Sequence, residues 1–152
     1  MQLTMTGEYA VRAMVYLAAL PSGTIAQIQE VAREWDIPEM FLRKIIPRLA
    51  GAGLLLSQRG AGGGIALARM PEQVTMLDVI EAVEGPMYLN RCLMSSWHCS
   101  RTDWCPVHEI WCTAQEELNK VLTARSLADI AAAAARRHAR HTDAHERQKQ
   151  FA

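Results

Sequence analysis

The chain has 152 residues, 50% of them hydrophobic, and its formal net charge is zero at pH 7. This length is enough for one domain with an attached arm and for a buried apolar core. Zero net charge excludes a uniformly basic nucleic-acid-binding domain, so a DNA-binding surface would have to be local. The sequence shows neither a signal-peptide pattern nor an apolar run long enough to cross a bilayer. We therefore expect a cytoplasmic protein that does not associate with membranes.

Two helices are expected in the first part of the chain. Apolar residues at helical spacing predict the first over Glu8–Leu20, and Pro21 follows it. Thr24 is expected to begin the second helix, with Gln27 completing a capping box three residues later. This second helix is predicted to end near Trp35.

A third helix is predicted to begin at Pro38, which suits a first helical turn. One of its faces carries Arg43, Lys44 and Arg48. Pro47 lies inside it and removes a backbone donor, so we expect a kink or an early stop there. The basic face is a candidate DNA-reading surface, although a solvated helix face has the same pattern.

Two short apolar runs follow, over residues 54–58 and 65–68, and the glycine-rich segment that begins at Arg59 separates them. This pattern predicts a β-hairpin, and no Lys-Ser/Thr pair follows the glycines as a phosphate-binding P-loop requires. Three helices and a hairpin form the order of a winged helix-turn-helix domain. In such a domain the third helix enters the major groove of DNA, and Arg59 on the wing can reach the minor groove.

The second half of the chain is predicted to be helical apart from a cysteine-rich segment. Thr75 with Asp78, and Ser126 with Asp129, have the capping-box spacing that begins a helix. The predicted fold is thus mainly α with a small β-hairpin. Its expected parts are a winged helix-turn-helix domain (1–85), a cysteine-rich segment (86–112), a dimerisation helix with a C-terminal helix (106–135) and a disordered basic tail (136–152).

Four cysteines, the whole complement of the chain, lie between Cys92 and Cys112. Such a cluster of soft ligands in a reducing compartment indicates a metal site, an iron–sulfur site or a redox pair rather than a disulfide framework. Three of the cysteines with His108 also form a good structural zinc set, so zinc remains an alternative cofactor. Trp97, Trp104 and Trp111 are expected to wall the site.

Five segments carry a resemblance to a known family: MQLTMTGEYAVRAMVYLA, FLRKIIPRLAGAGLL, RGAGGGIAL, MLDVIEAVEG and the cysteine segment. Their order and spacing, over roughly residues 1–135, resemble those of the bacterial IscR, NsrR and RirA regulators. The resemblance implies a homodimeric winged-helix transcription factor that binds palindromic double-stranded DNA. It also implies an iron–sulfur cluster that senses iron, cluster supply, nitric oxide or oxidants, and a long helix that pairs the subunits.

The resemblance also implies a ligand set. Cys92, Cys99 and Cys105 match the three cluster cysteines of the family, and His108 stands where IscR has its fourth ligand. Glu8 stands where NsrR-type proteins place an acidic ligand from the partner subunit. Cys112 is an additional cysteine that these patterns do not require, and it is a third candidate for the fourth ligand.

We therefore predict a homodimeric DNA-binding regulator, a repressor, that senses through a cysteine-ligated cluster of two-iron or four-iron type. Arg43 stands where IscR has a glutamate in its recognition helix, so the operator sequence is expected to differ. The alternative is a zinc- or thiol-stabilised winged-helix module that binds protein and holds no cluster. An enzyme is not expected, because the chain lacks a nucleophile–base constellation.

Overall fold

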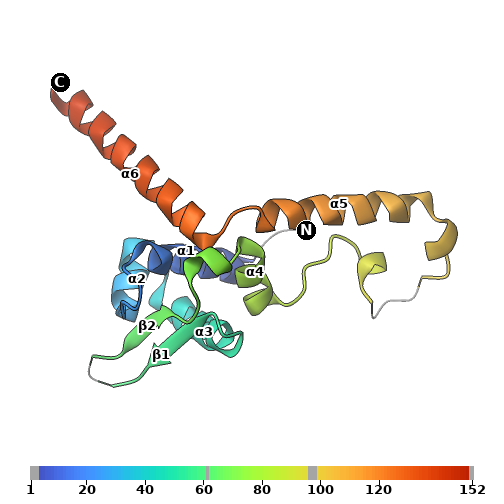
Figure 1. Cartoon of the computed structure of the whole chain (residues 1–152), viewed down its shortest axis with the longest axis horizontal. Helices are drawn as coiled ribbons and strands as arrows, with labels where there is room; N and C mark the ends of the chain where they lie inside the picture. The colour runs from blue at the N-terminus through green and yellow to red at the C-terminus, as the bar shows by residue number, and fades with distance from the viewer. Residues whose placement is uncertain (1–3, 61, 96–98, 151–152) are drawn as a thin grey trace.

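The computed structural model describes residues 4–60, 62–95 and 99–150, with side chains described as far as residue 140. The architecture is mainly helical with one two-stranded sheet, as predicted (Figure 1). The helices are α1 (Met5–Ala19), α2 (Ile28–Glu34), α3 (Glu39–Gly51), α4 (Met76–Glu84), α5 (Pro106–Thr123) and α6 (Leu127–Gln150), and the strands are β1 (Leu55–Gln58) and β2 (Gly64–Leu67). Single 3₁₀ turns are η1 (Pro71–Gln73), η2 (Arg91–Leu93) and η3 (Thr102–Trp104).

Helix α1 is the centre of the apolar core and packs against α3, α4 and α6. Its N-terminus is capped twice, because Thr4 Oγ1 and Glu84 Oε1 both accept from the Gly7 amide, at 3.4 and 3.1 Å. Met14 and the α3 residues Leu42 and Leu49 are completely buried. The apolar stripe predicted from helical spacing thus becomes the core of the N-terminal domain.

Helix α2 begins at Ile28, so the capping box predicted at Thr24 is wrong. The segment before α2 bonds to the wing instead: Ala26 and Ile65 exchange two backbone hydrogen bonds of 2.9 Å each. A Cβ at Gly64 would lie 2.3 Å from the Ala26 carbonyl oxygen, so this close approach requires glycine. The tertiary bridge therefore overrides the local capping signal.

Helix α3 contains Pro47 and continues to Gly51, so it does not stop early as the proline suggested. The buried side chains on either side of Pro47 hold the helix against the core: Leu42, Ile45, Ile46 and Leu49. This packing offsets the cost of the missing hydrogen bond, which is about 3 kcal/mol in an isolated helix. The hairpin after α3 is antiparallel and pairs Leu55 with Leu67.

The predicted caps of the last two helical regions are confirmed. Thr75 and Asp78 form a reciprocal capping box at the start of α4. Before α6, the Ser126 backbone and hydroxyl both donate to Asp129 Oδ2, at 3.0 and 2.8 Å. These hydrogen bonds lower the pKa of the Asp129 carboxyl.

Helix α6 continues through Gln150 and so includes most of the segment 136–152, for which a disordered basic tail was predicted. Residues 128–150 contain neither proline nor glycine and are rich in alanine and arginine, which favour helix. Figure 1 shows α6 projecting away from the β-hairpin, while the N-terminal end of α5 lies far from the core. None of the helices in the described part of the chain is long and apolar enough to span a membrane.

Candidate nucleic-acid interface and cysteine pocket

A groove of about 490 Å³ lies between α3 and the β-hairpin. Arg43 lines it from α3 and Arg59 lines it from the wing, so the fold brings these two predicted DNA-binding residues to one surface. Gln29 and Ser57 add polar groups to the same groove. This surface joins a helix to a hairpin, which is the arrangement that winged helix-turn-helix proteins use on DNA.

Both basic residues at the centre of α3 remain on its solvent-facing side. Arg43 Nε donates to Glu39 Oε1 at 2.8 Å, one turn away, and Lys44 Nζ lies 5.9 Å from the centre of the Phe41 ring. An exposed ion pair of this kind is worth about 0–1 kcal/mol. Arg43 can therefore exchange Glu39 for a guanine edge or a phosphate at little cost.

Arg48, the third basic residue predicted to bind DNA from α3, is not among the residues that line this groove. Its Nη1 donates to the Val83 carbonyl oxygen at 2.6 Å, at the end of α4. A cation at a helix C-terminus satisfies a carbonyl that has no partner within the helix. This hydrogen bond gives Arg48 a structural role that ties α3 to α4, and its predicted contact with DNA stays a prediction.

Gln27 is a residue of the interface that the sequence did not reveal. Its Nε2 donates to the Gly63 carbonyl oxygen at 2.6 Å and thereby holds the wing beside the start of α2. The sequence signal at Gln27 is the capping-box spacing from Thr24, which points to a local bond. A long-range hydrogen bond across 36 residues leaves no local signature.

The cysteine segment forms a second pocket, of about 340 Å³, at the N-terminal end of α5. Its lining residues are Asn90, Arg91, Cys92, Cys99, Thr102, Cys105, Val107, His108 and Trp111. Three separate stretches thus contribute a thiol each: η2, the segment before η3, and the residue that precedes α5. All four cysteines of the chain are free thiols of intermediate burial.

His108 lies between this pocket and the fourth cysteine. Its Nε2 lies 3.5 Å from Cys112 Sγ, one helical turn further along α5. Its Nδ1 is buried and is the one such side-chain nitrogen or oxygen without a hydrogen-bond partner among the described residues. A buried polar atom without a partner is costly, and a bound ion is one of the groups that can satisfy it.

These donors fit a metal or an iron–sulfur cluster by type and by shared location. Three thiols and one unpartnered imidazole nitrogen make a set that suits either iron–sulfur or zinc ligation. Among the described residues, no three Cys, His, Asp or Glu side chains are gathered closely enough to coordinate an ion. The pocket therefore collects the ligands without placing them at ligation distance.

Glu8 and Trp104, both predicted for this site, are not among the residues that line the pocket. Glu8 lies on α1 and pairs with Arg12, four residues along the same helix. Trp111 lines the pocket as expected, whereas Trp104 is 69% exposed and does not wall it. Trp97 lies outside the described residues.

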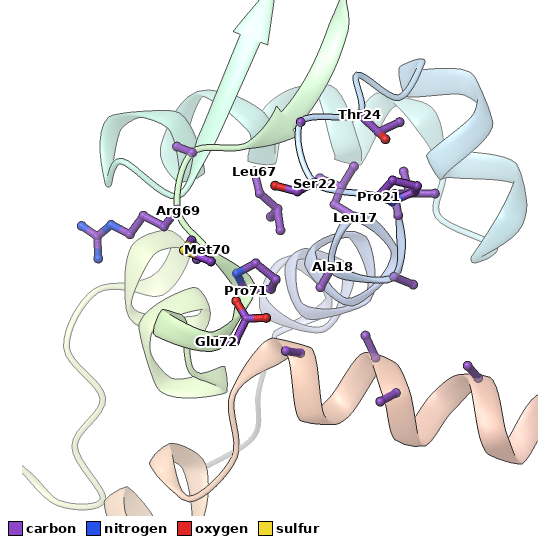
Figure 2. Close-up of a pocket in the computed structure, with 18 residues that line it drawn as sticks. Leu17, Ala18, Pro21, Ser22, Thr24, Leu67, Arg69, Met70, Pro71 and Glu72 are labelled. Carbon is purple, nitrogen blue, oxygen red and sulfur yellow. The ribbon is translucent and has the colours of Figure 1, made fainter.

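Another cavity, of about 620 Å³, lies away from both sites (Figure 2). The end of α1, the Pro21–Thr24 turn, the Leu67–Glu72 segment and the alanine-rich face of α6 enclose it. In Figure 2 the Arg69 side chain points away from its centre. The cavity contains neither cysteine nor histidine, so it is distinct from the cysteine pocket.

A family described as "Rrf2: Iron-dependent Transcriptional regulator" matches residues 3–133 of the chain. The chain belongs to the Rrf2 family. Its relatives include Rv1287 of Mycobacterium tuberculosis, which is named as an HTH-type transcriptional regulator. The two are 32% identical over 138 residues, which cover 91% of this chain and 86% of the relative.

Solved structures of Rrf2-type regulators have the same fold. CymR, the global cysteine regulator of B. subtilis, superposes with a TM-score of 0.70 at 25% identity, covering 87% of this chain and 97% of CymR. IscR of T. potens gives a TM-score of 0.68 at 28% identity, covering 88% of each chain. This Rrf2 protein is accordingly a winged-helix, DNA-binding transcriptional regulator and not an enzyme.

Proposed function

We propose that this Rrf2 protein represses transcription as a homodimer and senses its signal through an iron–sulfur cluster held by Cys92, Cys99, Cys105 and His108. The observation that carries the proposal is the pocket at the start of α5, which gathers these donors from three stretches of chain. No side chain caps the N-terminus of α5, and the positive end of its helix dipole favours an anionic group there. Glu8 and Cys112 are the less favoured fourth ligands.

The dimer is proposed to form through α5. No residue of this helix is buried, although Val107, Ile110 and Val121 are apolar and 52%, 66% and 71% exposed. They recur at heptad spacing on one face, which is typical of a helix that packs against another helix. A second copy of α5 would cover this face and would place two winged domains on a palindromic operator.

The signal is proposed to pass from the cysteine pocket to the DNA-binding domain through the segment between α4 and α5. A cluster bound in the pocket supplies a redox- and nitric-oxide-sensitive centre. Cys92 and Cys99 would then be held to Cys105, which fixes the segment against α5. The segment begins just after α4, where Arg48 ties Val83 to the recognition helix α3. DNA affinity changes only if these contacts differ between the protein with its cluster and the protein without it.

The matching experiment is a comparison of operator binding by the wild type and by a double Cys99→Ala, Cys105→Ala variant, purified without oxygen. The variant is expected to hold no cluster and to lose its response to nitric oxide or oxidant while remaining folded. Thr113→Ala on α5 serves as the matched control, because Thr113 is exposed and lies outside the pocket. A double variant that keeps both cluster and response would falsify the proposal.

Zinc is the second candidate cofactor, because the same donor set suits it. Zinc would make the segment a fixed support for the dimer helix, and the chain would then be a winged-helix interaction module without a cluster. Charge reversal at Arg43 and Arg59 separates the two functions. It should abolish operator binding by a regulator and leave protein binding by such a module unchanged.

A further inference from the structure

Cys112, the cysteine that does not line the pocket, contacts the candidate ligand His108. Its Sγ lies 3.5 Å from His108 Nε2, and both residues lie on α5 at a spacing of four. Residues four apart on a helix are neighbours on one face, so α5 itself fixes this contact. Cys112 is not among the residues that line the pocket, whereas His108 is.

The two ring nitrogens of His108 therefore have different surroundings. A neutral imidazole carries one N–H and one lone pair, so the hydrogen bond at one nitrogen decides what the other offers. If the Cys112 thiol donated to Nε2, the proton would lie on Nδ1, which is buried and has no acceptor among the described residues. If Nε2–H donates to Cys112 Sγ, Nδ1 carries a lone pair. The second arrangement leaves no buried donor unpaired.

We propose that Cys112 is a positioning residue that accepts a hydrogen bond from His108 Nε2 and so makes Nδ1 the nitrogen that binds the metal. The inference rests on the proposed metal site and deepens it, since it assigns the ligand atom and the role of the additional cysteine. Ligating histidines usually donate their other ring N–H to a neighbouring acceptor, which fixes the ring and its tautomer. Here a thiol takes the place of the usual carboxylate or carbonyl.

The full-length protein loaded with cadmium-113 alone tests this assignment without a cluster. Histidine labelled with nitrogen-15 at Nδ1 or at Nε2 should give a cadmium–nitrogen coupling with the Nδ1 label only. Cys112→Ala should weaken cadmium binding by roughly 10- to 100-fold, the usual effect of losing such a partner. Cys112→Ser keeps an acceptor and should lose less, and Thr113→Ala should leave cadmium affinity unchanged.

Three results would overturn the inference: coupling to Nε2, no coupling to either nitrogen, or equal cadmium affinity in the wild type and Cys112→Ala. A cadmium shift characteristic of four thiolates would also overturn it, because Cys112 would then be a ligand. Circular dichroism checks that each variant keeps α5. The proposed function can fail while this inference holds. That would be the result if protein purified without oxygen contained no iron or sulfide but still gave the coupling to Nδ1.

Discussion

The winged domain and the cysteine segment differ in what holds them in place. In the winged domain, α1, α3 and α4 share a continuous core whose largest side chains, such as Met14 and Leu42, are fully buried. In the second region, α5, η2 and η3 contain no buried residue. The candidate DNA-binding surface therefore lies on a scaffold that its own apolar core stabilises.

The cysteine segment has few such contacts within one chain. The hydrogen bond of 2.8 Å from the Leu89 amide to Gln115 Oε1 is one of the ties that hold it to α5. A bound metal and a partner subunit would supply the contacts that the core supplies elsewhere. The winged domain is thus preformed, whereas the proposed sensing would depend on a group that binds in the cysteine pocket.

The largest expected effect comes from the DNA surface. The double variant Arg43→Glu, Arg59→Glu should lower operator affinity by at least about 100-fold, because it removes two positive charges from the groove and adds two negative ones. Fluorescence anisotropy at fixed salt measures this loss. Arg140→Glu on the distant α6 is the matched control and should bind DNA as the wild type does.

The next largest effect is on the free energy of unfolding, which should respond to substitutions in the winged domain and not to those on α5. Leu42→Ala should lower the free energy of unfolding by about 2–5 kcal/mol, because Leu42 is fully buried in the core. Ile110→Ala should leave the unfolding of a monomer nearly unchanged and should weaken dimerisation instead. Urea unfolding and analytical ultracentrifugation distinguish these outcomes. Similar losses of stability in both variants would contradict the distinction between the regions.

Arg48 should behave differently from Arg43, its neighbour on α3. Arg48→Ala should destabilise the winged domain by about 1–3 kcal/mol, since the carbonyl of the buried Val83 loses a charged donor. Arg43→Ala should weaken operator binding and leave thermal stability unchanged within about 0.5 kcal/mol. Loss of operator binding without loss of stability in Arg48→Ala would instead favour the predicted contact between Arg48 and DNA.

Two glycines offer a matched pair for testing the wing. Gly64→Ala should destabilise the protein and weaken DNA binding, because its Cβ would collide with the Ala26 carbonyl that anchors the hairpin. Gly51→Ala meets no atom within 4 Å and should stabilise α3 by about 0.5–1 kcal/mol. Melting temperatures of the two variants should therefore shift in opposite directions.

The smallest effect concerns pH. The hydrogen bonds from Ser126 lower the pKa of Asp129 in the folded protein. The stabilisation from this cap is therefore fully present above the pKa of aspartate in the unfolded chain, ~3.9. It is lost as the pH falls through the lower pKa that Asp129 has in the folded protein. NMR titration of the Asp129 carboxyl should give this lowered pKa, and Ser126→Ala should bring it back toward the ordinary value.

Local patterns predicted most of the fold and part of the site. Helical spacing predicted α1, capping boxes predicted the starts of α4 and α6, and the glycine-rich turn predicted the hairpin. Tertiary contacts decide where local patterns fail: Ala26 pairs with Ile65, so α2 begins later than predicted. The hydrogen bond from Arg48 to Val83 is likewise a long-range contact that no local pattern predicts. The contact of Cys112 with His108 depends on side-chain direction along α5, which spacing alone allows but does not fix.

Iron, sulfide and zinc analysis of protein purified without oxygen, together with its ultraviolet–visible spectrum, tests the central proposal most directly. The account predicts a coloured protein with iron and sulfide in matched amounts, both lost in the double Cys99→Ala, Cys105→Ala variant. A colourless protein with one zinc per chain and no sulfide would contradict it. The cysteine pocket would then be a structural zinc site, and the signal would have to act elsewhere.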